Sequence, residues 1–154
     1  MTYRICLVCM GNICRSPMAE AVLRATIAEH GLDGVVVESA GTGGWHAGGP
    51  MDERAARTLA ANGYDGAGHR ARQFTRSWFE EYDLVLAMDR DNQRELQRLA
   101  DGPVRLFRSF DPAAPRDAEV PDPYYGGQDG FDIVLRQVEA AAEGLAKWLA
   151  DEIR

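Results

Sequence analysis

The ten-residue segment VCMGNICRSP, at positions 8–17, joins an apolar run to a helix-start signal. The run YRICLVC, at 3–9, is a continuous β-prone apolar run, which is typical of a strand buried on both faces. Ser16 and Pro17 match an N-cap followed by proline at the first helical position. The segment therefore predicts a tight turn that leads from a buried strand into a helix.

The remaining chain repeats this alternation of strand and helix. Apolar positions after Pro17 recur at helical spacing up to Gly31, which predicts the first helix. Further strands are expected at 35–39, 83–88 and 103–107, further helices at 52–62, after Thr75, at 89–100 and at 131–152, and a long surface loop at 109–130. This order predicts one α/β domain over residues 1–154, with a parallel sheet covered by helices on both faces. Ligands of such sheets bind beyond the carboxyl ends of the strands, where segment 8–17 lies.

Charge and cysteine usage narrow the function classes. The chain has 154 residues, and 17 Lys and Arg against 24 Asp and Glu give a net charge of -7, which disfavours nucleic-acid binding. No apolar run approaches the roughly 20 residues of a membrane span, and residues 1–4 lack the plan of a signal peptide. Cys6, Cys9 and Cys14 are clustered and odd in number, so they form no disulfide framework. We expect a cytoplasmic protein with a reactive thiol and no membrane partner.

The turn after the first strand has the residue types of an anion site that carries a nucleophile. Backbone N–H groups and the helix dipole attract an anion at a helix start. Gly11 and Asn12 tolerate left-handed backbone, and the planar Arg15 guanidinium can bind two phosphate oxygens. The same field favours a thiolate at Cys9. This combination predicts attack on phosphorus and a cysteinyl phosphate, with neither a metal nor a cofactor required.

Cys6 and Cys9 also spell C-x-x-C, which is typical of redox and metal sites. Residues three apart on a strand point to opposite faces of the sheet, so the two thiols should not meet. A fourth metal ligand is also missing, because no cysteine follows Cys14. We therefore expect Cys6 in the core.

Four motifs together resemble the low-molecular-weight protein tyrosine phosphatases: CMGNICRSPMAE at 9–20, SAGTGGWHAG at 39–48, HRARQ at 69–73 and DPYYG at 122–126. The resemblance implies a flavodoxin-like, Rossmann-like three-layer sandwich with a four-stranded parallel sheet in the order 2-1-3-4. It implies that Cys9 is the nucleophile, Arg15 the transition-state clamp and Asp122 the general acid and then base. Without the resemblance, an Asp before Pro123 in a long loop would be interpreted as a turn former.

The resemblance also implies supporting roles for other residues. The phosphate-binding loop would comprise Cys9, Met10, Gly11, Asn12, Ile13, Cys14 and Arg15, supported by a network of Ser16, Asn12, Ser39 and His69. Trp45, Tyr124 and Tyr125 would form aromatic walls for the substrate ring, and Cys14 would be the redox partner of Cys9.

Partners and compartment follow from the same resemblance. Phosphotyrosine-containing proteins would be the substrates, and a tyrosine kinase could act on Tyr124 and Tyr125. We expect a monomer. Some bacterial members of the family are exported without a signal peptide, which leaves the exterior as an alternative to the cytoplasm.

Other functions fit the motifs less well. A thiol-dependent arsenate reductase needs a further cysteine pair downstream, and no cysteine follows Cys14. A dinucleotide-binding fingerprint in the glycine-rich segment 41–49 would need glycine at position 46, which is His46. The acidic stretch 88–92 resembles the start of a calcium-binding loop, but Gln93 and Arg94 occupy its next ligand and glycine positions. A phosphopeptide-binding module could dispense with Cys9 or Asp122, but both are present. The basic cluster His69, Arg70, Arg72 and Arg76 either attracts acidic phosphoproteins or forms a solvated surface.

Overall fold

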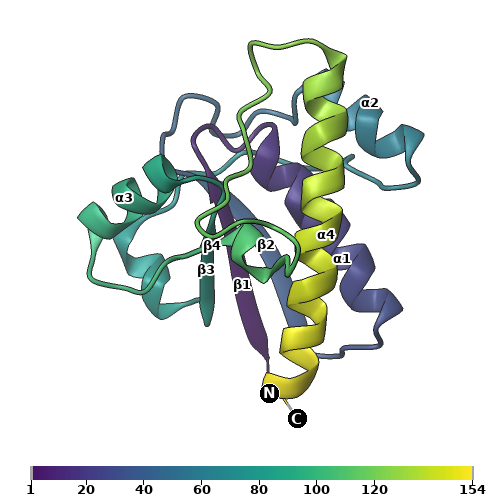
Figure 1. Ribbon diagram of the computed structural model, residues 1–154. Helices are drawn as coiled ribbons and strands as arrows, with labels where there is room; N and C mark the ends of the chain where they lie inside the picture. Colours follow the sequence, from purple (N-terminus) through teal and green to yellow (C-terminus); the bar gives the residue numbers. More distant parts are fainter. Residues whose placement is uncertain (1, 154) are drawn as a thin grey trace.

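The computed structural model describes residues 2–153 and contains a four-stranded parallel sheet (Figure 1). Its strands are β1 (Tyr3–Cys9), β2 (Val35–Gly41), β3 (Leu84–Ala87) and β4 (Arg105–Leu106), in the spatial order β2-β1-β3-β4. This order confirms the flavodoxin-like α/β fold expected from the resemblance. Met1 and Arg154, the end residues of the expected domain, lie outside the described residues.

Strand β1 occupies a central place in the sheet. It pairs in parallel with β2 along its whole length, from Tyr3 opposite Val35 to Cys9 opposite Gly41, and with β3 on its other side. Its last five residues are buried, as expected for a strand covered on both faces. Cys9 therefore lies at the carboxyl end of an inner strand, where ligands of such sheets bind.

Helices cover both faces of the sheet (Figure 1). The helices α1 (Arg15–Glu29), α2 (Glu53–Ala61) and α4 (Gln128–Glu152) lie together on one face, and α3 (Arg90–Leu99) lies on the other with the 3₁₀ segment η1 (Arg76–Glu80). A second 3₁₀ segment, η2 (Phe107–Phe110), follows β4 and packs on α4. The alternation of Cys6 and Val8 with Ile5 and Leu7 divides β1 between the two apolar clusters.

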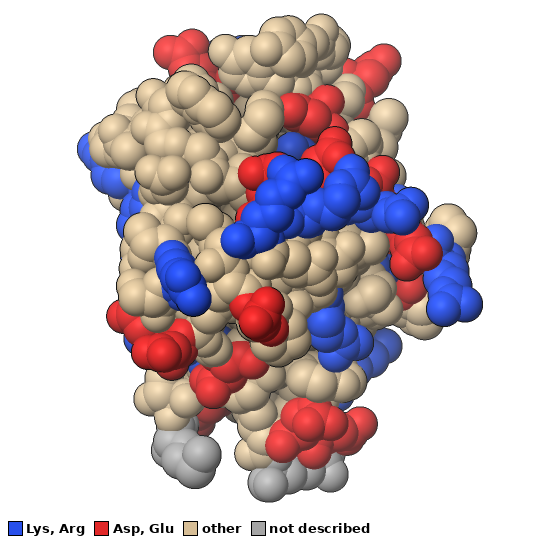
Figure 2. All heavy atoms as spheres, turned by 90° about the vertical axis from the view of Figure 1, so that its left-hand side faces the viewer, with Lys and Arg blue, Asp and Glu red and all other residues tan. Residues whose placement is uncertain are grey.

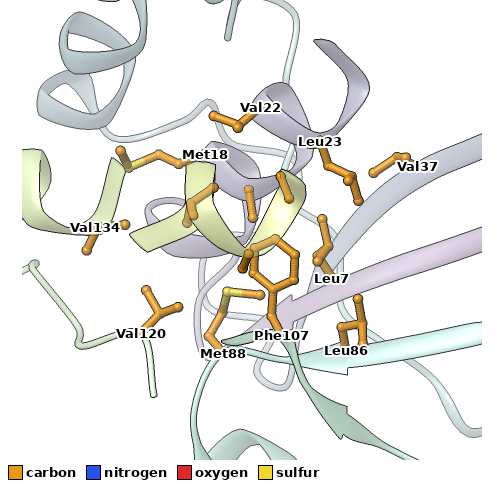
Figure 3. Close-up of a cluster of buried hydrophobic side chains, with 14 of the residues drawn as sticks. Leu7, Met18, Val22, Leu23, Val37, Leu86, Met88, Phe107, Val120 and Val134 are labelled. Carbon is orange, nitrogen blue, oxygen red and sulfur yellow. The ribbon is translucent and has the colours of Figure 1, made fainter. Parts of the chain in front are cut away.

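The larger cluster fixes the segments that surround the carboxyl end of β1 (Figure 3). Leu7 from β1 and Met18 from α1 are fully buried within it, as is Val120, which precedes Asp122 by two residues. Complete burial of an aliphatic side chain contributes about 1.5–3 kcal/mol. Hydrophobic packing therefore holds the start of α1 and the chain before Asp122 in fixed positions.

The start of α1 differs from the sequence prediction. The helix begins at Arg15 rather than after Ser16, its N-cap is Cys14, and no side chain caps it. Pro17 still lies in the first turn, where its missing N–H is tolerated. The prediction was wrong because the Ser16 hydroxyl bonds to Asn12 and approaches Cys9 instead of capping the helix.

The other element boundaries lie close to the predicted ones. The predicted helix ends are confirmed: Gly31 and Gly63 both have left-handed backbone just after α1 and α2. Strand β2 is longer than expected, while β3 and β4 are shorter. The long loop ends earlier than expected, because α4 already begins at Gln128.

The face of the molecule that carries α3 shows Arg side chains next to Asp and Glu (Figure 2). On α3 itself, Arg94 pairs with Asp91 and Arg98 with Glu95. Such exposed pairs at helical spacing contribute about 0.3–0.5 kcal/mol each. None of the helices within residues 2–153 is long and apolar enough to cross a membrane.

Candidate active site

Cys9 ends β1 with its thiol held between two donors. The backbone N–H of Asn12 donates to Cys9 Sγ at 3.3 Å, and Ser16 Oγ lies 3.0 Å from the same sulfur. Residues 9–15 thus turn back over the end of the strand before α1 begins. The Cys9 sulfur therefore lies against two hydrogen-bonding groups at the amino end of α1.

Asn12 is the central residue of this loop and is fully buried. Its φ is 58°, in the left-handed region that Asn tolerates better than most residues. Its side-chain amide donates to Ser16 Oγ (2.8 Å) and Ser39 Oγ (2.9 Å), and its Oδ1 accepts from the Arg72 backbone (2.9 Å). His69 Nε2 lies 2.8 Å from the Asn12 carbonyl oxygen. The structure thus brings Ser16, Asn12, Ser39 and His69 together in one network.

The backbone conformation of Gly11 differs from the left-handed one that the sequence predicted for it. Its φ is outside the left-handed region, so Asn12 alone provides the left-handed turn of the loop. A Cβ at Gly11 would lie 3.2 Å from the His46 ring, which is tighter than most such contacts. Glycine at this position allows close approach of the exposed His46 ring and does not serve a left-handed backbone.

Arg15 presents a buried guanidinium to the same site. Its Nη1 donates to Asp89 Oδ2 at 2.6 Å and to the Val120 carbonyl at 3.0 Å, and its side chain is only 3% exposed. Burial lowers the pKa of Arg15, but the negative charges of Cys9 and Asp89 raise it on balance. Arg15 is therefore a fixed cation whose remaining donors are available to an anion.

Asp122 lies across from Arg15 on the loop that precedes α4. Its Oδ2 is 3.8 Å from Arg15 Nη2, and its Oδ1 accepts from the backbone N–H of Tyr124 at 3.1 Å. The side chain is 35% exposed. A carboxyl group that meets both solvent and the Arg15 site has access to water and to a bound anion.

These groups line one cavity of about 170 Å³. Its lining residues are Cys9, Met10, Gly11, Ile13, Cys14, Arg15, His46, Asp122, Tyr124 and Tyr125. The structure does not bring Trp45 into this cavity. The Trp45 side chain folds back onto Gly43, where a Cβ would clash with its ring, and Trp45 is 73% exposed. The role predicted for Trp45 stays a prediction.

Cys14 lines the same cavity and is buried. Burial, with the negative charges of Asp52 and Cys9, raises the pKa of Cys14 to about 12. Cys6, in contrast, packs in the smaller apolar cluster on the α3 side of the sheet, and burial raises its pKa further. The prediction that Cys6 belongs to the core is confirmed, and the C-x-x-C pair does not converge.

A larger cavity, of about 560 Å³, borders the Asn12 network. Ser39, His69 and Arg72 line it, but none of the three cysteines does. The smaller cavity has the chemistry for catalysis because it combines a nucleophile, a cation and a carboxyl group. Within residues 2–153 no three or more His, Cys, Asp or Glu side chains are grouped to hold a metal ion.

Two residues of this site were missed by sequence reasoning. Asp89 holds Arg15 and caps α3, and His46 lines the cavity beside Gly11. Asp89 follows β3 by two residues, so its place at the carboxyl edge of the sheet was a usable signal. His46 follows Trp45 in a glycine-rich segment, and nothing in its spacing indicates the contact.

Comparisons with known proteins agree with this site. A family model described as "Low molecular weight phosphotyrosine protein phosphatase" matches residues 4–154. A low molecular weight protein-tyrosine-phosphatase of Streptomyces coelicolor is 54% identical, over 99% of this chain and 97% of the relative. The structure of YfkJ from Bacillus subtilis has a TM-score of 0.93 at 32% identity, covering 100% of this chain and 98% of YfkJ. Wzb of Vibrio vulnificus, solved with benzylphosphonate, has a TM-score of 0.85 at 29% identity, covering 97% and 100%. The chain belongs to the low molecular weight phosphotyrosine protein phosphatase family.

Proposed function

We propose that this phosphatase hydrolyses phosphotyrosine in proteins, and aryl phosphates, through a cysteinyl-phosphate intermediate. Family membership supports the reaction class. The observation that carries the mechanism is that Cys9, Arg15 and Asp122 line one cavity of about 170 Å³. A nucleophile, a clamp for the phosphoryl oxygens and a proton donor are the groups that phosphoryl transfer from an aryl ester requires.

In the first step the Cys9 thiolate attacks phosphorus. The S–P bond forms while the bond from phosphorus to the phenolic oxygen breaks. Arg15, held by Asp89 and the Val120 carbonyl, binds two of the phosphoryl oxygens with its free donors. Asp122 gives its proton to the departing phenolate, which makes that oxygen a better leaving group.

In the second step water attacks the phosphorus of the intermediate. Asp122, now a carboxylate, accepts a proton from this water, and the S–P bond breaks to release phosphate. The Asn12 N–H and Ser16 hydroxyl at the sulfur stabilise the Cys9 thiolate as it leaves. One acid–base group thus serves both steps.

The walls of the cavity favour an aromatic ester. Tyr124 and Tyr125 stand with their ring centroids 5.0 Å apart, in an edge-to-face arrangement at the cavity. An aromatic ring of the substrate gains stacking and apolar contact there, which an aliphatic phosphate lacks. The benzylphosphonate complex of Wzb supports the same class of ligand for a relative.

The surface residues suggest how the protein meets its partners. Tyr125 is 90% exposed, so a tyrosine kinase could reach its hydroxyl more easily than that of Tyr124, which is 38% exposed. Phosphoproteins of the cytoplasm are the substrates that we propose.

The basic cluster predicted from the sequence is divided in the structure. Arg72 donates to the Tyr82 hydroxyl and forms an ion pair with Glu38, while Arg70 and Arg76 are exposed.

Rapid mixing with para-nitrophenyl phosphate in EDTA tests the proposal. We expect hydrolysis in EDTA, with release of nitrophenolate during the first turnover that approaches one equivalent per chain when hydrolysis of the intermediate is slower than its formation. Cys9→Ser should abolish turnover while retaining phosphate binding. No release by the wild-type protein would contradict the proposed reaction.

Cys6→Ala is the matched control for loss of a buried thiol. Cys6 packs in the apolar cluster on the α3 side of the sheet and does not line the cavity, so this variant should keep the turnover of the wild type. Equal loss of turnover in Cys6→Ala and Cys9→Ser would mean that the thiols act through folding rather than through chemistry.

A further inference from the structure

The loop that carries Asp122 has few contacts of its own. We call residues 121–126 the acid loop. Before it, Val120 is anchored: its N–H donates to the Met88 carbonyl at 2.8 Å, and its carbonyl accepts from Arg15. The acid loop itself is exposed except at Pro123. A short exposed loop with few internal bonds needs an external contact to hold one conformation.

Arg54 provides that contact from α2. Its Nη2 donates to the Tyr124 carbonyl at 2.9 Å and its Nη1 to the Gly126 carbonyl at 3.4 Å. Within residues 2–153 these are the hydrogen bonds that reach the backbone of the acid loop from another element. The guanidinium carbon also lies 5.4 Å from the Tyr124 ring centroid and 4.8 Å from that of Phe131. One planar cation thus contacts both the loop and the helix that follows it.

Asp52 fixes the orientation of Arg54. Its carboxylate accepts from Arg54 Nε at 3.2 Å and from Nη2 at 3.0 Å, and it also caps α2 through the Arg54 N–H at 2.8 Å. Burial raises the pKa of Asp52, but the hydrogen bonds from Arg54 hold it below the usual value; the same contact raises the pKa of Arg54. Both groups are therefore charged at neutral pH.

The same Asp52 connects this ion pair to the nucleophile's loop. The Asp52 N–H donates to the Ile13 carbonyl at 2.9 Å. A continuous set of hydrogen bonds thus runs from Ile13 through Asp52 and Arg54 to Tyr124 and Gly126. In Figure 1, α2 stands beside the end of α4 at which the acid loop enters that helix. The start of α2 therefore makes hydrogen bonds both to the loop that follows Cys9 and to the loop that carries Asp122.

We propose that Arg54 is a positioning residue for Asp122, which holds the acid loop at the distance from residues 9–15 that protonation of the leaving oxygen requires. This inference rests on the proposed function. Among the described residues Arg54 does not line the cavity, and no hydrogen bond or ion pair joins it to Asp122, so it acts through the loop conformation. A misplacement of about 1 Å can slow a catalysed step about 100-fold.

Such a role has a signature that a general structural role lacks. Protonation matters most when the leaving group is a strong base and little when it is a good leaving group. Loss of Arg54 should therefore slow phenyl phosphate more than para-nitrophenyl phosphate. The comparison uses kcat/KM, because this parameter reports the steps up to departure of the leaving group.

The test compares Arg54→Gln with Arg57→Gln. Arg57 lies on the same helix, is 67% exposed and pairs only loosely with Glu53 at 3.8 Å, so it is the matched control. We expect Arg54→Gln to lower kcat/KM for phenyl phosphate about 10- to 100-fold and for para-nitrophenyl phosphate less than about 3-fold. Arg54→Lys, which keeps the charge but not the fork, should restore part of the loss. Arg57→Gln should match the wild type.

A double variant shows whether Arg54 acts through Asp122. In the Asp122→Ala background, Arg54→Gln should change kcat/KM for phenyl phosphate less than about 2-fold, because no acid remains to be positioned. Equal slowing of both substrates by Arg54→Gln, or an undiminished effect in the Asp122→Ala background, would overturn the inference. If Asp122→Ala itself showed no leaving-group dependence, the proposed acid role would fail instead, so the two failures are distinguishable.

Discussion

Cys9 Sγ and Ser16 Oγ lie 3.0 Å apart, although Ser16 belongs to the first turn of α1 and Cys9 to the end of β1. The hydroxyl also accepts from the Asn12 side chain at 2.8 Å, so its own proton is left for one of two acceptors, the Cys9 sulfur at 3.0 Å or the Ala40 carbonyl oxygen at 3.4 Å, of which the sulfur is the nearer. A hydrogen bond to a charged group contributes about 1.5–3 kcal/mol. Ser16 is therefore placed to stabilise the thiolate whenever Cys9 carries the negative charge.

Ser16→Ala should slow hydrolysis of the phosphoenzyme about 10- to 100-fold, because the departing thiolate loses this hydrogen bond. The first-turnover release of nitrophenolate should then become more prominent relative to the steady rate. Stopped-flow absorbance measures both phases. Ser77→Ala is the control, since Ser77 is exposed and its hydroxyl bonds to that of Thr75, away from the cavity that Cys9 lines. An unchanged steady rate in Ser16→Ala would exclude Ser16 from the leaving-group role.

Asn12→Ala and Asn12→Gly should separate two contributions to stability. Ala loses the buried side-chain bonds and also suffers the left-handed φ of 58°, whereas Gly suffers only the first loss. We expect Asn12→Ala to lower the free energy of unfolding by about 2–4 kcal/mol. The decrease in Asn12→Gly should be smaller than that in Asn12→Ala by about 1–2 kcal/mol, because Gly has no steric cost at this φ. Urea denaturation measures both values. Equal destabilisation by the two variants would show that backbone strain at this position is unimportant.

Asp89→Asn should impair catalysis more than it impairs folding. Asn is as good an N-cap as Asp, so α3 keeps its bond to the Asn92 N–H, observed at 2.7 Å. The carboxylate that holds the Arg15 guanidinium at 2.6 Å is lost, however, and an amide N–H cannot replace it. We expect kcat/KM for para-nitrophenyl phosphate to fall at least about 10-fold, with a thermal midpoint within about 4 °C of the wild type. Wild-type activity in Asp89→Asn would contradict the positioning of Arg15 by charge.

Cys14 should protect an oxidised Cys9 by forming a reversible disulfide with it. The rate of this disulfide formation should depend on pH. Peroxide oxidises the Cys9 thiolate to a sulfenic acid with release of hydroxide, and the Cys14 thiolate then attacks that sulfur to form the disulfide as a second hydroxide leaves. Because the pKa of Cys14 is raised to about 12, its thiolate fraction increases about tenfold per pH unit between pH 6 and pH 9. Disulfide formation should accelerate in parallel, as followed by mass spectrometry of quenched samples.

The variant Cys14→Ser tests the protective role. After peroxide and then a thiol reductant, the wild type should recover activity, whereas Cys14→Ser should lose activity irreversibly as Cys9 is oxidised further. Equal recovery of the two proteins, or a disulfide rate independent of pH, would mean that Cys14 does not act as the resolving thiol.

The parts of the fold that could be predicted are those that depend on local pattern. A continuous apolar run identified β1, and Asn-Gly or a lone Gly identified the ends of α2 and α1. The start of α1 was predicted too late, because a side chain that usually caps a helix contacts Cys9 instead. Cys9 and Arg15 were predicted as site residues from residue type and spacing within one turn, which a single sequence displays, and the structure places both at one cavity.

The contacts of other site residues could not be predicted because their partners are distant in sequence. Asp89 meets Arg15 across 74 positions, and Arg54 meets Tyr124 across 70. An Asp at the start of a helix is typically a cap and an Arg on a helix is typically solvated, so their residue types alone carry no signal of these contacts. Asp122 was identified only through the resemblance, since an Asp before a Pro is more often a turn residue. Topology places these groups, and topology is not readable from the spacing within one segment.

The most direct test of the central claim is to trap the covalent intermediate. The protein is mixed with para-nitrophenyl phosphate, stopped with denaturant during turnover, digested and analysed by fragmentation mass spectrometry. The account predicts one phosphoryl group, located on Cys9 rather than on Cys6 or Cys14, and none in Cys9→Ser. A phosphoryl group on another residue, or continued turnover by Cys9→Ala, would contradict the account.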